Sequence, residues 1–213
     1  MPVQQGFAPL VENPQLADFQ VLQLYLHFIN EVRCAYSATV NLDITALKRY
    51  RLYPAMIWLL TKTVNQMPEF RTALTDEGLG IYDQIHPAYT IFNQESKTFS
   101  GIWTEANPDY SEFLKAYEAD TAEFSSSAKF APKPDRPPNS FDISMVPWFT
   151  FTAFDSNVFG EGKYLLPIFT IGKFFEANGR RMLPLAIQAH HVWLIILFCG
   201  RKHPPLGRFA FFK

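Results

Sequence analysis

Residues 182–191 read MLPLAIQAHH, a mostly apolar stretch that ends in two adjacent histidines. The apolar residues from 182 to 189 predict a strand within a sheet. Successive side chains of a strand point to opposite faces, so we expect the rings of His190 and His191 to point in opposite directions. One imidazole would then pack inward, while the other would face a cleft and act as a base near neutral pH.

Further strand and helix patterns lie on the N-terminal side of this segment. Short apolar or alternating patterns predict strands over 38–44, 79–83, 88–92, 99–103, 141–145, 149–154 and 164–171. Helical spacing appears over 55–67 and 111–124, and we expect both helices to pack on a face of the sheet. Pro54 favours a helix start, and Ser111 is the expected N-cap of the second helix. Ser, Pro and Lys are frequent in residues 125–140, which predicts an extended surface connection.

The composition fits a single α/β domain over residues 1–213 with mixed helix and strand order. Apolar residues make up 48% of the chain and include 21 Phe, which is enough for a substantial core. The 19 basic and 20 acidic residues nearly balance, which argues against general attraction to nucleic acid or an anionic membrane. The partners must therefore be sought in a specific site.

Cysteine usage and the chain ends restrict the setting. Cys34 and Cys199 lie far apart and lack zinc-site spacing, so we expect neither a disulfide framework nor a metal site. The first residues lack the pattern of a signal peptide, and the longest apolar run, 192–199, is too short to span a membrane. We therefore expect a cytoplasmic protein.

Several enzyme classes are excluded by missing motifs. The chain has no phosphate-cradling glycine loop, no dinucleotide fingerprint and no G-x-S-x-G elbow. The histidine doublet by itself fits a structural or surface role as well as a catalytic one. Basic and apolar residues around it would also suit base stacking on nucleic acid, but the balanced charge favours a core strand.

A resemblance gives these patterns a more specific meaning. The blocks CAYSATVNLDIT (34–45), ISMVPWFTFTAF (143–154) and LPLAIQAHH (183–191) resemble segments of the type A chloramphenicol acetyltransferases. The intervening blocks that match in order and spacing are 52–74, 80–92, 96–103 and 165–175. The resemblance covers residues 26 to 191. It implies a CoA-dependent acyltransferase fold, an α+β sandwich in which helices flank a mixed sheet.

The resemblance also implies an assembly and a reaction. The family is trimeric with active sites between subunits, and it transfers the acetyl group of acetyl-CoA directly to the C3 hydroxyl of chloramphenicol, which inactivates the antibiotic. By this resemblance His191 is the general base that takes the hydroxyl proton, and His190 is structural. Ser144 is matched to the hydroxyl that stabilises the oxyanion, and Thr170 to a threonine that holds a nearby water.

The binding residues follow from the same resemblance. Trp148 is expected beside the CoA co-substrate, and Arg51 and Lys173 are expected to meet its phosphates. The residues expected around chloramphenicol are mostly apolar and would serve equally well in a core. They are Phe28, Cys34, Thr90, Phe99, Phe154, Val158 and Ile168.

The chain departs from the family over residues 1–25 and 192–213. The family motif continues H-H-x-x-x-D-G, but here Ile195 and Ile196 stand at the Asp and Gly positions. The N-terminal W-x-R block, whose Arg pairs with that Asp, is also absent, so both halves of one ion pair are missing. Either a variant tail or a change of reading frame would produce this pattern.

Three functions are consistent with these observations. The first is an active chloramphenicol acetyltransferase, and the second is a catalytically impaired homologue that binds drug or CoA. The third is an acyltransferase with another acceptor, such as the lipoamide-linked cores that share the fold, although the drug-specific blocks argue against it.

Overall fold

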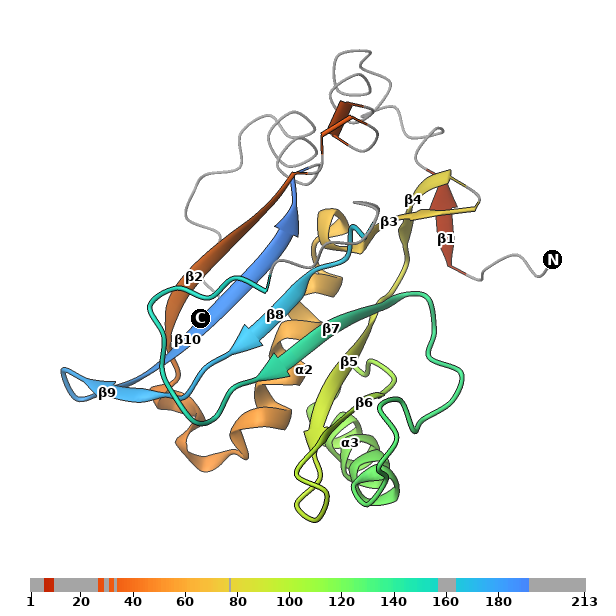
Figure 1. Ribbon diagram of the computed structural model, residues 1–213. Helices are drawn as coiled ribbons and strands as arrows, with labels where there is room; N and C mark the ends of the chain where they lie inside the picture. The colour runs from red at the N-terminus through yellow and green to blue at the C-terminus, as the bar shows by residue number, and fades with distance from the viewer. Residues whose placement is uncertain are drawn as a thin grey trace.

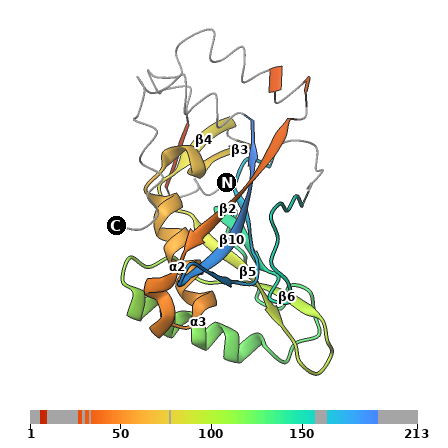
Figure 2. The same cartoon turned by 90° about the vertical axis from the view of Figure 1, so that its left-hand side faces the viewer.

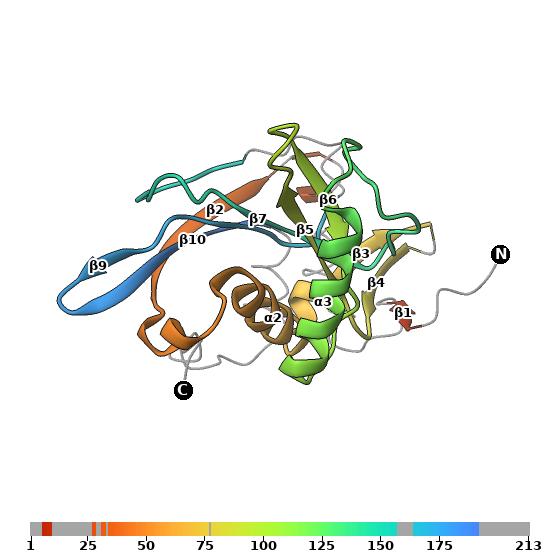
Figure 3. The same cartoon turned by 90° about the horizontal axis from the view of Figure 1, so that it is seen from below.

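A mixed sheet forms the centre of the molecule, and α2 (Leu52–Asn65) and α3 (Tyr110–Phe124) pack against one face of it (Figure 1, Figure 3). The computed structural model describes residues 6–9, 27–28, 31–32, 34–76, 78–156 and 164–191. Neither of these two helices lies on the opposite face of the sheet (Figure 3).

The strand order of the described sheet is β2-β10-β8-β7-β5-β6, and β9 also pairs with β10. The strands are β2 (Ala35–Asp43), β10 (Arg180–His190), β8 (Ile168–Ile171), β7 (Ser140–Met145), β5 (His86–Phe92), β6 (Phe99–Trp103) and β9 (Phe175–Ala177). The pairs β5–β7 and β7–β8 are parallel and the others antiparallel, which confirms the expected mixed sheet. Figure 2 shows β2 and β10 side by side, since they pair over nine registered positions.

Smaller elements extend the fold beside α2. A second described sheet has the order β1-β4-β3, from β1 (Phe7–Pro9), β4 (Gly78–Tyr82) and β3 (Thr72–Thr75). The short 3-10 helices η2 (Thr45–Arg49) and η3 (Pro68–Arg71) precede and follow α2. No helix among the described residues is long and apolar enough to cross a membrane.

The two helices form where the sequence pattern predicts them, with small differences at their ends. In α2 the buried residues Met56, Leu60 and Val64 recur at four-residue spacing, so one face of the helix meets the sheet. The sequence predicted Ser111 as the N-cap of α3, and this prediction is wrong. The cap is Asp109, whose carboxylate accepts a hydrogen bond from the Glu112 amide at 3.0 Å. Aspartate and serine cap equally well, and Asp109 comes first.

The core lies between the helices and the sheet. Side chains alternate along the strands, so Tyr89, Ile143, Phe169 and Leu185 point to the helices and are almost fully buried. Their strand neighbours point to the opposite face. The register places Ala186, Thr170 and Ser144 in one row on that face.

Two strand predictions need correction. Residues 149–154 alternate like a strand but form irregular chain; Phe154 N donates to the Thr39 hydroxyl, and Phe151 is buried. The alternation reflects local burial and not a sheet ladder. The predicted strand 164–171 begins only at Ile168, because Pro167 has no N–H to donate to a ladder.

Candidate functional site

Ser144 and Thr170 lie side by side in the middle of the sheet. They are directly paired residues of the parallel strands β7 and β8, so both side chains point to the face without helices. Their hydroxyl oxygens are 3.2 Å apart, and Thr170 is only 3% exposed. The structure therefore brings together these two sequence-predicted residues. Two adjacent hydroxyl groups fixed by a sheet can donate hydrogen bonds to a single oxygen atom that gains negative charge.

A pocket of about 160 Å³ opens beside Ser144 on this face. It is lined by Thr90 and Ile168, which the sequence had placed around the acceptor, and by Asp142. Part of its wall comes from the connection between α3 and β7, in particular Phe130 and Arg136. We refer to it below as the acceptor pocket. The connection was predicted only as a surface loop, and no sequence pattern marked it as a pocket wall.

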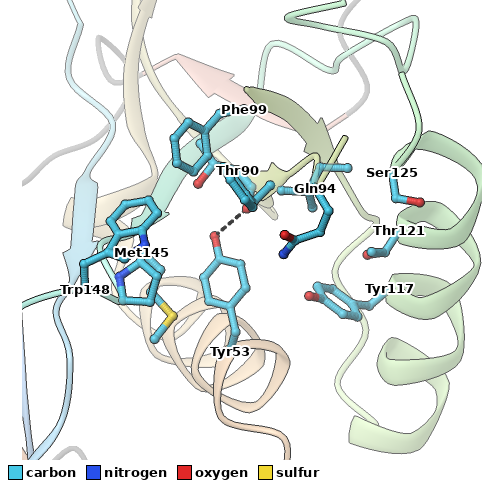
Figure 4. A pocket seen from close by; sticks show the side chains of 12 residues that line it. Tyr53, Thr90, Gln94, Phe99, Tyr117, Thr121, Ser125, Met145 and Trp148 are labelled. Atoms are coloured by element: carbon cyan, nitrogen blue, oxygen red, sulfur yellow. Dashed lines mark hydrogen bonds between the residues drawn. The ribbon is translucent and has the colours of Figure 1, made fainter. Parts of the chain in front are cut away.

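The sheet splits next to this pocket. Strands β5 and β7 pair only as far as Tyr89 and Ile143, although both continue for some residues. The Tyr53 hydroxyl lies at the split, donating to the Thr90 carbonyl oxygen at 3.1 Å, with the Ile143 carbonyl oxygen at 3.5 Å (Figure 4). Burial raises the pKa of Tyr53 well above its ordinary value, so the phenol keeps the proton that it donates.

A larger pocket, with a volume of about 470 Å³, reaches the same split from the side of the helices. Tyr53 and Tyr117 come from α2 and α3, whereas Phe99 and Trp148 line another wall (Figure 4). Trp148 is 57% exposed and meets the Phe99 ring edge-on, with 5.8 Å between the centroids. We call this the helix-side pocket. Thr90 lines both pockets, so they meet at this residue.

The basic residues that the sequence had assigned to CoA lie near the helix-side pocket. Arg51 precedes α2, two residues before Tyr53, and pairs with Glu118 of α3 at 2.6 Å. Both partners of this pair are exposed, so the ion pair contributes little to stability and can be exchanged for an anionic ligand. Lys173 is exposed, and its backbone N–H bonds to the carbonyl of Phe149, the neighbour of Trp148.

His191 lies just beyond the C-terminal end of β10, which ends at His190. Its backbone N–H donates to the Cys34 carbonyl at 2.9 Å, and its ring lies 4.3 Å from the Phe28 ring between centroids. The ring of Tyr36 approaches it edge-on. Phe28 and Cys34, predicted near the acceptor, are therefore neighbours of His191. His190 is 6% exposed, in agreement with the packing role expected for it.

The imidazole of His191 and the hydroxyl pair of Ser144 and Thr170 do not meet within one chain. Thr170 of β8 pairs with Ala186 of β10, and His191 comes five residues after Ala186. At about 3.3 Å per residue, His191 is about 17 Å from the Ser144–Thr170 pair, too far for one substrate atom to contact both. The described chain thus carries two separate halves of the predicted site.

The remaining predicted residues have simpler outcomes. Phe154 packs against Phe151 with ring centroids 5.2 Å apart, and its backbone N–H donates to the Thr39 hydroxyl in the middle of β2. Val158 lies outside the described residues. No cluster of three metal-ligating side chains occurs in the described part of the chain. The residues that the sequence missed are Tyr53, Arg136 and Asp142. Tyr53 lies within a matched block, but only the strand split shows what its hydroxyl contacts.

The sequence was compared with models of known protein families. A model of the chloramphenicol acetyltransferase family matches residues 15–201. The chain belongs to the chloramphenicol acetyltransferase family. It is therefore an acyltransferase, and the match extends beyond residues 26–191 at both ends.

Named relatives agree with this assignment. The chloramphenicol acetyltransferase of Bacillus pumilus is 46% identical over 171 residues, which cover 78% of each chain. That of Clostridium perfringens is 45% identical over 168 residues, covering 78% of this chain and 81% of the relative. That of Vibrio anguillarum is 44% identical over 172 residues, covering 79% and 80%.

Solved structures confirm the acyltransferase fold. A chloramphenicol acetyltransferase structure has a TM-score of 0.73 at 17% identity, over 85% of this chain and 90% of that chain. The dihydrolipoamide acetyltransferase of Azotobacter vinelandii has a TM-score of 0.58 at 17% identity, over 87% and 86%. At this identity the likeness shows the fold alone, which chloramphenicol acetyltransferases share with lipoamide-linked cores.

Proposed function

We propose that the protein transfers the acetyl group of acetyl-CoA to the C3 hydroxyl of chloramphenicol, in an active site shared by two neighbouring chains of a cytoplasmic homotrimer. Family membership supports the reaction. The observation that carries the shared site is the separation of His191 from Ser144 and Thr170 within one chain. A second copy that places its His191 at the acceptor pocket completes the site.

The substrates approach from the two pockets that meet at Thr90. The acceptor pocket receives chloramphenicol beside Ser144, and the helix-side pocket receives the long arm of acetyl-CoA along Tyr53 and Trp148. Aromatic and apolar walls suit both ligands. Arg51 and Lys173 lie outside the helix-side pocket, where their charges face the phosphates of the same substrate.

The reaction needs one base and one oxyanion donor. The imidazole of His191 takes the proton of the C3 hydroxyl as its oxygen attacks the thioester carbon. The carbonyl electrons move to oxygen, and Ser144 donates a hydrogen bond to this oxyanion while Thr170 holds the serine in place or binds a water beside it. The intermediate then collapses, the carbon–sulfur bond breaks, and the proton passes from His191 to the sulfur of CoA. No acyl group is attached to the protein.

Thiol release tests the activity directly. Purified protein is incubated with acetyl-CoA and chloramphenicol, and the free CoA thiol is followed with a thiol-reactive dye. We expect release that depends on chloramphenicol. Dihydrolipoamide has thiols of its own that react with the dye, so with this acceptor the formation of CoA is followed by chromatography instead, and none should form. Binding of chloramphenicol or CoA without release would establish the impaired homologue. That outcome would point to Ile195 and Ile196, which replace the family's Asp and Gly. Formation of CoA and acetylated dihydrolipoamide in the absence of chloramphenicol would establish the lipoamide-linked activity.

Mixed assemblies test the shared site. His191→Ala and Ser144→Ala chains, each of which should retain at most about 1% of the activity alone, are unfolded, mixed in equal amounts and refolded. In a ring of three chains, random mixing restores both groups at one interface of each mixed trimer, so about a quarter of the wild-type activity returns. If both groups acted within one chain, the mixture would stay inactive. Sedimentation of the wild-type protein as an active monomer would also contradict the proposal.

A further inference from the structure

The wall of the acceptor pocket is a segment of irregular chain that crosses from α3 to β7. Residues 130–136, here called the wall segment, contribute Phe130, Ala131, Lys133 and Arg136 to the pocket lining. The segment has no strand or helix hydrogen bonding of its own. Its position must therefore be set by contacts to neighbouring elements.

Four contacts hold the wall segment. At its start, the Gly101 N–H donates to the Phe130 carbonyl at 2.7 Å. In the middle, the Trp103 indole N–H donates to the Pro134 carbonyl at 3.1 Å. Arg136 closes the far end with an ion pair to Asp142 at 2.9 Å, in which both partners are more than 40% exposed. The fourth and least exposed anchor is Lys133.

Lys133 pairs with Asp120 of α3 in a partly enclosed setting. The Lys133 Nζ lies 2.6 Å from Asp120 Oδ1, and each side chain is only 17% exposed. The same ammonium lies 4.2 Å above the centre of the Trp103 ring. Water screens this pair much less than the exposed pair of Arg136, so it is the stronger electrostatic anchor.

Asp120 is itself fixed by a chain of hydrogen bonds from the sheet. The Thr104 hydroxyl donates to Asp120 Oδ2 at 2.6 Å. Because that proton is committed to a carboxylate, the Tyr89 hydroxyl donates to Thr104, at 2.8 Å. Tyr89 is the last residue of β5 that pairs with β7, beside the split next to Ser144. The network thus connects the wall segment to the strand that borders the reacting groups.

We propose that Lys133 and Asp120 are positioning residues for the acceptor: their ion pair holds the wall segment against α3 and thereby sets the shape of the acceptor pocket. This inference rests on the proposed acceptor site. The helix-side pocket contains neither residue, so the pair acts on chloramphenicol and leaves acetyl-CoA unaffected.

Steady-state kinetics of two single variants, the double variant and a control test the inference. Lys133→Met removes the charge and keeps the length of the side chain; we expect the KM for chloramphenicol to rise at least about tenfold, because a displaced wall misplaces the acceptor. The KM for acetyl-CoA should stay within about twofold. Asp120→Asn should act in the same direction. If the two residues act as one unit, the double variant is no worse than the more damaging single variant.

Lys115→Met is the matched control. It breaks the Lys115–Glu112 pair on the same helix, which has a similar length of 2.7 Å but is exposed, and neither of its residues lines either pocket. Both KM values should stay at their wild-type level. Calorimetric titration with chloramphenicol gives the affinity independently of turnover.

Two results would overturn the inference. One is a wild-type KM for chloramphenicol in a folded Lys133→Met protein. The other is an equal rise in both KM values, which indicates general loosening. Should Lys133→Met not fold, Thr104→Val removes one hydrogen bond to Asp120, and the KM for chloramphenicol alone should rise by a smaller factor; an unchanged value would reject the positioning role. Failure of the proposed function looks different, since the wild-type protein would then release no CoA thiol with chloramphenicol.

Discussion

Ser144 and Thr170 lie within the sheet, whereas His191 lies just beyond the end of β10. The positions of the two hydroxyl groups are set by backbone ladders, with β8 lying between β7 and β10. Among the described residues, His191 is held by a backbone hydrogen bond to Cys34 and by ring contacts to Phe28 and Tyr36. The oxyanion half of the site is thus part of the sheet itself, and the base half depends on what packs around a strand end.

This difference gives the sequence departures their meaning. Ile195 and Ile196, which stand at the expected Asp and Gly positions, come four and five residues after His191, whereas Ser144 and Thr170 lie within blocks that resemble the family. A loss of activity in this chain should therefore arise from a misplaced base and not from a damaged oxyanion site.

The largest effect is expected at the histidine doublet. His191→Ala should lower kcat by about a thousandfold or more, since general bases contribute up to about 10⁴-fold. His190→Ala should chiefly lower the melting temperature, because His190 is buried at a strand end. Thiol-release kinetics and thermal unfolding measure the two effects. Equal losses of activity in two fully folded variants would remove the distinction between the rings.

Ser144→Ala tests the sheet half. The hydrogen bond to the oxyanion exists only as charge develops, so kcat should fall about 100- to 1000-fold while both KM values stay nearly constant. This corresponds to about 2.7–4 kcal/mol of transition-state stabilisation. A water that enters the vacated space would recover part of it. Nearly full kcat in a variant that binds CoA normally would make Ser144 a structural strand residue.

Tyr53→Phe should lower stability and kcat by a smaller amount, through the part of the site that lies around Ser144. The change leaves the Thr90 carbonyl at the strand split without its donor, which typically costs about 1–3 kcal/mol of unfolding free energy. We expect a few-fold drop in kcat, because Thr90 borders both pockets. Urea unfolding and kinetics measure these changes. Wild-type values for both would show that the phenol does not hold the split.

The smallest expected effect is a change of the free energy of unfolding with pH. It arises from His86 and not from His190 or His191. Burial lowers the pKa of His86, whose Nδ1 accepts a hydrogen bond from the Ala106 N–H at 2.9 Å. The folded protein therefore binds this proton less readily than the unfolded chain, and the resulting stability is present above about pH 6.5 and is lost as the pH falls below that value. Unfolding in urea at pH 7.5 and 5.5 should show the decrease.

His86→Gln serves as the control for this prediction. The Gln amide oxygen can still accept the backbone hydrogen bond but does not titrate, so the pH dependence should become weaker. If the free energy of unfolding of this variant depends on pH as strongly as that of the wild type, His86 is not the group responsible.

Local patterns in the sequence predicted most strands and both helices, because alternation and helical spacing depend on which side chains are buried. The same signal failed at residues 149–154, where Phe151 is buried without a partner strand. It also placed the cap of α3 at Ser111, two residues beyond the actual cap Asp109, because serine and aspartate are equally good N-cap residues.

The candidate site was predictable only in part. Resemblance identified Ser144, Thr170 and His191, but their separation depends on the register between β8 and β10, which is a non-local property. The contribution of the wall segment was hidden for the same reason. Lys133 meets Asp120 only because the chain folds back across α3. The Ser-, Pro- and Lys-rich composition of residues 125–140 indicates nothing beyond a loop.

The meeting of two pockets at Thr90 has a consequence for inhibitors. A compound that fills only the helix-side pocket should compete with acetyl-CoA and leave the affinity for the antibiotic intact, and a compound in the acceptor pocket should show the reverse pattern. Two such compounds would bind together. A single molecule that passes the strand split beside Tyr53 would exclude both substrates, and its narrowest part would have to fit between the backbones of β5 and β7.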